Sequence, residues 1–363
     1  MSEVRASLLG PEDPAPKPPS ATGGTQGLRR EWRGPTYYGR PALKAAPFNN
    51  WVVGGYIFLA GLSGAAAILS TLADRARPRH GRDVVRRGRY LSLLAPTVGA
   101  SLLVYDLHTP QRFYNMLRVA KGTSPMSIGT WLLMGFSAAG GLAAAMQFLA
   151  DRMPWRRWPG RVARAASVPA AALGAGMSTY TAALLAATST PLWAAAPRAL
   201  AMRFGGSSIA SGAAALSLGE PPGPTRRALD AVAVAALAAE LAAASSQRRS
   251  YDRAGVAGAL EGGWGQVERI GATGLGTALP LGLHALSLAE GGDGRLSRLA
   301  SLAILGGSLL LRVSTMAAGD VSANRPEVSF RFAQPDNLPG PGRRTRSVRA
   351  SRRAALRGMP AAR

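Results

Sequence analysis

The stretch that decides the fold is residues 45–73, which read AAPFNNWVVGGYIFLAGLSGAAAILSTLA. These 29 residues contain no charged side chain. A helix needs about 20 consecutive apolar residues to cross the hydrocarbon core of a bilayer, so this stretch is long enough to span a membrane. Residues 122–150 and 165–197 are also uncharged and long enough. The sequence therefore predicts an all-α integral membrane protein.

The charge of the chain is concentrated between the apolar stretches. The 363 residues include 43 Lys and Arg against 19 Asp and Glu, a net charge of +24, yet 47% are hydrophobic. That apolar fraction is too high for a disordered basic protein. The Arg-rich C-terminal tail contains no recognisable nucleic-acid-binding module, so we expect no nucleic-acid partner. Cysteine is absent, which excludes disulfides and iron–sulfur clusters bound by this chain.

The pattern predicts a bundle of about eight transmembrane helices within residues 36–323. Its helices are rich in Ala, Gly and Ser, which let neighbouring helices approach closely. Residues 1–35 are predicted to form a disordered tail, with no signal peptide, and residues 324–363 a mobile Arg-rich tail. The predicted spans are residues 50–73, 89–107, 126–150, 164–188, 196–219, 227–247, 268–289 and 296–318.

The loops predict an orientation in the membrane. The loops after the first, third, fifth and seventh spans carry more basic residues near the helix ends than the loops after the second, fourth and sixth. Loops rich in Lys and Arg remain on the cytoplasmic side. We therefore expect a multi-pass protein of the bacterial cytoplasmic (inner) membrane with both termini on the outer side.

Polar residues at one side of the predicted bundle form a candidate site. Asn49 and Asn50 open the first span and Asp106 ends the second, whereas Tyr180 lies about 12 Å inside the fourth. Such groups could bind the two oxygens of a quinone and take up its protons. Separate capping and interfacial roles for each residue are the alternative. The candidate site residues are Asn49, Asn50, Asp106, His108, Arg112 and Tyr180.

The segment that follows Asp106 has an amphipathic pattern. Thr109 can cap a helix, and Phe113, Met116 and Leu117 then fall on one face. This pattern predicts a short interfacial helix over residues 109–120. It would serve as a docking platform for a peripheral partner, or only connect two spans.

Three further polar residues lie within predicted spans: Glu240, His284 and Arg312. Buried charges need a reason, and either a structural ion pair or a proton path would supply one. His284 is the only histidine well inside a span, so we expect no haem and no metal centre.

The stretch DLHTPQRFYNMLRVAKGTSPMS, residues 106–127, resembles the NrfD family, the membrane subunits related to polysulfide reductase. Weaker similarity extends over roughly residues 36–325. The family usually has a His–Asp pair where this chain has Tyr105 and Asp106, and His108 replaces a glycine.

The resemblance implies an eight-helix subunit without haem or an iron–sulfur cluster of its own. It implies electron exchange between the membrane quinone pool and an iron–sulfur partner with four clusters, which is linked to a molybdopterin catalytic subunit. Quinone or menaquinone would be an exchangeable substrate. The matched candidates are Asn49 or Asn50, Asp106 and Tyr180, with His108 and Arg112 nearby. Asp106 and His108 would handle the protons.

Two other functions remain open from the sequence. A secondary transporter would use half-helices interrupted at matching places in two repeats. A purely structural membrane anchor would have no quinone site at all.

Overall fold

The computed structural model describes residues 43–76, 81–107, 110–118, 120–290 and 294–333. Helices dominate this part of the chain, and no strand occurs within those ranges. The predicted all-α class is therefore confirmed for the described residues. The predicted disordered segment 1–35 and most of the Arg-rich tail lie outside the described ranges.

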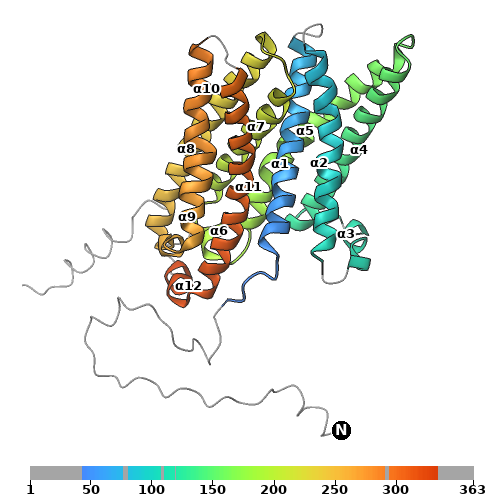
Figure 1. Ribbon diagram of the computed structural model, residues 1–363. Coiled ribbons are helices and arrows are strands. Elements are labelled where there is room, and N and C mark those ends of the chain that lie inside the picture. Colours follow the sequence, from blue (N-terminus) through green and yellow to red (C-terminus); the bar gives the residue numbers. More distant parts are fainter. Residues whose placement is uncertain (1–42, 77–80, 108–109, 119, 291–293, 334–363) are drawn as a thin grey trace, which may run out of the picture.

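Eight long helical segments form a bundle (Figure 1). Each overlaps one of the predicted spans, because each predicted span coincides with a weakly charged apolar stretch. The segments are α1 (Asn50–Ala76), α2 (Arg82–Tyr105), α4 (Pro125–Arg152), α5 (Trp158–Ala186), α7 (Pro197–Leu218), α8 (Pro224–Ala254), the continuous run of α9 (Gly263–Gln266), η6 (Val267–Ala278) and α10 (Leu279–Ala289), and α11 (Gly294–Asn324).

Six of these segments are long and apolar enough to cross a membrane. They are α1, α4, α5, α8, the run from Gly263 to Ala289, and α11. The exceptions are α2, whose first turns are rich in arginine, and α7, which contains Arg198 and Arg203. The chain is thus a multi-pass membrane protein, and a total of eight crossings stays a prediction.

The two ends of the bundle differ (Figure 1). We call the end where α1 begins and α2 finishes the lower end, and the opposite one the upper end. The lower end carries short helices: α3 (Asn115–Arg118), α6 (Pro191–Ala194), α9 and α12 (Pro326–Ala333). Consecutive long helices alternate in direction, so the residues at the start of α1 and the end of α2 meet there.

The sequence predicts a mobile tail from residue 324, but residues 326–333 form helix α12. Pro326 supplies the first helical position, where its missing N–H costs nothing. Val328 and Phe332 are buried one turn apart and pack with Leu192, Tyr251 and Leu260. This apolar face anchors residues 326–333 to the bundle.

An ion network at the upper end compensates the charged beginning of α2. The buried Arg89 donates hydrogen bonds to Asp74 of α1 and Ser167 of α5, both at 3.0 Å. Arg164 also pairs with Asp74. At the neighbouring loop, Arg87 pairs with Glu220. Burial raises the pKa of Glu220, and this ion pair opposes the increase.

Glycines allow the close helix contacts that the small-residue composition predicts. A Cβ atom on Gly64 of α1 would overlap the backbone of Gly174 on α5, and the reverse also holds. Gly276 of η6 and Gly307 of α11 are opposed in the same way. These contacts bring backbone against backbone, so any larger residue must push two helices apart.

We predict that Gly307→Ala destabilises the bundle, whereas Gly306→Ala does not. A methyl group at residue 307 meets Gly276, while residue 306 faces open space. Overpacking of this kind costs about 1–3 kcal/mol. The measurement is the melting temperature of the two variants in detergent. Equal melting temperatures would show that the Gly276–Gly307 contact is not tight.

Candidate functional site

Asn49 connects the beginning of α1 to the end of α2. Its backbone N–H donates to Oδ1 of Asp106 at 3.2 Å. Its side-chain oxygen accepts from the N–H groups of Trp51 at 3.0 Å and Val52 at 3.3 Å, which caps α1. The structure therefore brings two of the predicted site residues, Asn49 and Asp106, into direct contact at the lower end.

Asn50 connects α1 to the last turns of α11. Its amide nitrogen donates to Oδ2 of Asp320 at 3.0 Å. Its Oδ1 atom is buried and has no hydrogen-bond partner among the described residues. Asp320 is absent from the residues predicted from sequence because it falls beyond the predicted end of the last span at residue 318. The available signal was a carboxylate directly after a long apolar segment.

Tyr180 lies on α5 but bonds to the beginning of α4. Its hydroxyl donates to the backbone oxygen of Pro125 at 2.7 Å. Its ring fills the space beside Gly129, where a Cβ atom would overlap it. No hydrogen bond among the described residues joins Tyr180 to Asn50 or Asp106. Tyr180 belongs to the lower half of the bundle, and its hydroxyl is held by α4.

Two of the remaining predicted residues are not described. His108 and Thr109 lie outside the described ranges, as does the side chain of Arg112. Their proposed roles stay predictions.

The predicted helix over residues 109–120 is wrong as a single element. The described part consists of a 3-10 turn, Pro110–Arg112, followed by the four-residue α3. Backbone bonds three residues apart join Phe113 to Pro110 and Met116 to Phe113. Met116 and Leu117 are partly buried and Phe113 is exposed, so few apolar contacts stabilise a longer helix.

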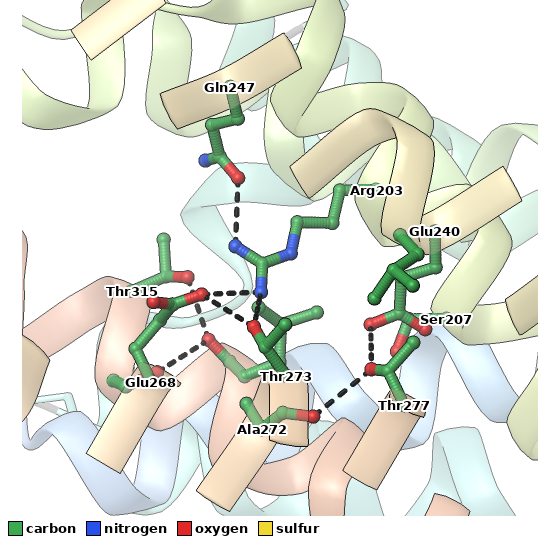
Figure 2. Close-up of polar contacts among 12 residues, drawn as sticks. Arg203, Ser207, Glu240, Gln247, Glu268, Ala272, Thr273, Thr277 and Thr315 are labelled. Carbon is green, nitrogen blue, oxygen red and sulfur yellow. Dashed lines mark hydrogen bonds and ion pairs between the residues drawn. The ribbon is translucent and has the colours of Figure 1, made fainter. Parts of the chain in front are cut away.

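A polar network surrounds Glu240 in the second half of the bundle, which consists of the helices from α7 to α11 (Figure 2). The hydroxyl of Thr277 donates to Glu240 at 3.1 Å, and the Ser207 side chain also bonds to Glu240. Arg312 donates to Ser207 at 2.5 Å and to the Phe204 oxygen at 3.1 Å. Glu240 and Arg312 are therefore connected through Ser207, and no direct ion pair between them occurs in the described structure.

A second set of polar residues, absent from the predictions, adjoins this network (Figure 2). Arg203 of α7 pairs with Glu268 at 2.5 Å and donates to Gln247 at 3.0 Å and Thr273 at 2.7 Å. Glu268 and Thr273 belong to the π-helix η6. A π-helix often marks a functional site. Side-chain periodicity does not distinguish this π-helix from an α-helix, so the sequence predicts only a regular span here.

His284 belongs to a different cluster, near the upper end. Its Nδ1 lies 3.5 Å from Oδ1 of Asp230, which also accepts from Ser297 at 3.0 Å. Buried apolar residues of α8 and α11, including Leu237 and Ile304, occupy positions between this cluster and Glu240. The predicted proton-path residues are therefore divided between two clusters.

Two cavities occur near the lower end in the described structure. One, of about 450 Å³, is lined by residues of α7, α8, η6 and α11 that include Arg203 and Tyr251. The other, of about 680 Å³, lies among Leu43, Ala186 and Phe332 and their neighbours. Neither is lined by Asn50, Asp106 or Tyr180.

We predict that Arg312→Leu lowers the free energy of unfolding by about 3 kcal/mol. The substitution leaves Ser207, Ser208 and the Phe204 oxygen without their charged donor. Unfolding in sodium dodecyl sulfate measures the loss. The control is Arg298→Leu, because Arg298 is exposed on the same helix. Equal stability of the two variants would contradict a structural role for Arg312.

Part of the chain is similar to a known family of membrane proteins. Residues 44–219 match the family model described as "Polysulphide reductase, NrfD", which covers α1 to α7. No curated relative matches the chain. The family consists of membrane subunits of quinone-linked oxidoreductases, which generally work with iron–sulfur and molybdopterin subunits. Asn49, Asn50, Asp106 and Tyr180 all lie in the matched region. Residues 44–219 of the chain therefore match the NrfD family.

Proposed function

We propose that this chain passes electrons between the membrane quinone pool and an iron–sulfur partner subunit, with the quinone bound at the lower end of the bundle. The observation that carries the proposal is the convergence of α1, α2 and α11 on Asn49 and Asn50. Through these two residues, the carboxylates of Asp106 and Asp320 are held at one end of the bundle.

The polar atoms of this cluster suit the chemistry of a quinol. The unpartnered Oδ1 of Asn50 can accept a hydrogen bond from one quinol hydroxyl. Asp106 uses Oδ1 to bind Asn49, which leaves its other oxygen for a proton. Oxidation of a quinol to a quinone releases two electrons and two protons. Asp106 would take one proton, assisted by His108, and the second would leave through the nearby aqueous surface.

Tyr180 has a different part in the proposal. Its hydroxyl proton is engaged by the Pro125 oxygen, so the phenol oxygen acts as an acceptor for the second quinol hydroxyl. Arg112 would lie over the same region. The quinone or menaquinone ring would reach Tyr180 from the side of α4, with its isoprenoid tail in the lipid.

The surface around α3 is the proposed contact for the iron–sulfur partner. Phe113 and Tyr114 are both exposed, with ring centroids 6.5 Å apart. Exposed aromatic residues are common at protein interfaces. Met116 and Leu117 would form the base of this contact, and Thr109 its beginning. A molybdopterin subunit would contact the iron–sulfur subunit and not this chain.

The upper end, rich in arginine, would face the cytoplasm of an inner-membrane protein, which places the lower end and both termini outside. Glu240, with Arg312 beside Ser207, is a candidate for proton transfer within the second half of the bundle. His284 would act separately, with Asp230.

We predict that Asp106→Asn lowers quinol-linked electron transfer on the order of 100-fold, because an amide cannot accept the proton. The measurement is quinol oxidation by membranes that contain the assembled complex. Asp83→Asn is the matched control, since Asp83 is exposed at the opposite end of the same helix. The control should retain full activity.

Three outcomes would reject the proposal. Unchanged activity in Asp106→Asn would remove Asp106 from the reaction. Assembly of the complex without any quinol oxidation by the unaltered chain would indicate a purely structural anchor. Uptake of a solute by the chain alone in vesicles, without a copurifying iron–sulfur subunit, would favour a transporter.

A further inference from the structure

The cavity of about 450 Å³ is lined by none of the residues that the quinone proposal uses, which include Asn50, Asp106 and Asp320. Its walls come mainly from α7, α8, η6 and α11, and its apolar lining includes Leu241 of α8, Leu192 of α6 and Leu260. Its polar lining includes three arginines, Arg203, Arg248 and Arg269, and one carboxylate. The lining residues therefore carry three positive charges and one negative charge, an excess of two positive charges.

The buried polar residues that line the cavity form a preorganised set, of which Figure 2 shows Arg203, Gln247 and Glu268. Arg203 is buried and pairs with Glu268, so these two charges neutralise each other. Gln247 receives a bond from Arg203 and donates to the hydroxyl of Tyr251. Tyr251 is 4% exposed, and its own hydroxyl proton has no acceptor in the described structure. A ligand oxygen in the cavity would supply that acceptor.

The mouth of the cavity carries the excess charge. Arg248 of α8 and Arg269 of η6 are both exposed, so the cavity reaches the surface between these two helices. Arg248 makes only an exposed pair with Asp252 at 3.4 Å, and such pairs contribute little. Two arginines with unused donors at one opening favour a phosphate group, which guanidinium groups bind well.

The position of the mouth suits a ligand that is part of the membrane. Arg248 lies six residues before the end of α8 at Ala254, and Arg269 six residues after Gly263, which is about 9 Å from the helix ends at 1.5 Å per residue. Both arginines therefore lie near one end of the bundle and not at its centre. Ile270, next to Arg269, is 63% exposed and offers an apolar surface to an acyl chain.

We propose that this cavity binds the phosphodiester head group of an anionic membrane phospholipid. Arg248 and Arg269 hold the phosphate, Tyr251 donates to a head-group oxygen, and the acyl chains run along the surface beside Ile270. A free phosphate would gain nothing from the apolar walls, and a neutral quinone would gain nothing from the charge at the mouth. Basic pockets between transmembrane helices on the cytoplasmic side of other membranes hold anionic head groups, and the same charge pairing would act at this end of the bundle.

Native mass spectrometry of the delipidated full-length chain tests the proposal. The probes are phosphatidylglycerol, phosphatidylcholine with the same acyl chains, and inorganic phosphate. We expect one phosphatidylglycerol to bind with a clear preference over phosphatidylcholine. Arg248→Ala with Arg269→Ala should weaken that binding about 30-fold, and Arg248→Lys with Arg269→Lys should restore most of it. Tyr251→Phe alone should also weaken the binding of phosphatidylglycerol.

The control is Arg156→Ala with Arg157→Ala, which removes the same charge from an exposed loop at the upper end. It should leave phosphatidylglycerol binding unchanged. Equal loss in the control would show nonspecific attraction and overturn the proposal. Equal binding of phosphatidylcholine, or displacement of the lipid by inorganic phosphate alone, would also overturn it. None of these results depends on the quinone reaction.

Discussion

A charged group cannot lie unpaired in the hydrocarbon core of a membrane, and the arrangement of this protein follows from that constraint. Most arginines lie at the upper end or in the tails. Those inside the bundle have dedicated partners: Arg312 donates to oxygens of α7, and Arg203 bonds to Glu268, Gln247 and Thr273. Each of these sets joins helices that are distant in sequence. The same bonds that make buried charge tolerable therefore fix how α7, α8, η6 and α11 pack.

The two halves of the bundle consequently have different characters. The first half, from α1 to α5, is held by glycine contacts such as Gly64 against Gly174, and its polar contacts lie at the two ends of the bundle. The second half carries most of its polar residues in the interior, around Glu240 and His284. Asp320 connects them, because it belongs to α11 and yet binds Asn50 of α1. A quinone at this junction would contact both halves.

Sequence patterns predict the helices well because uncharged stretches and their length determine which segments can enter a membrane. The placement of Asn49 and Asp106 at one side is also predictable, since alternating helices bring the start of the first and the end of the second together. Three features cannot be predicted from the sequence. Asp320 depends on where α11 ends, the Arg203 network depends on which faces of four helices meet, and η6 has no periodic signature. The short helix α3 differs from the predicted one because its exposure, a tertiary property, removes the contacts that a longer helix needs.

The central claim is that quinone binds at the lower end of the bundle, where α1, α2 and α11 converge. Photoaffinity labelling of the full-length chain in membranes with an azido-quinone tests it most directly, with labelled peptides identified by mass spectrometry. The account predicts labels within residues 43–57, 103–107 or 316–324, or beside Tyr180, which excess quinone suppresses and Asp106→Asn reduces. Labels confined to α8 and α10, or labels that excess quinone does not suppress, would contradict it.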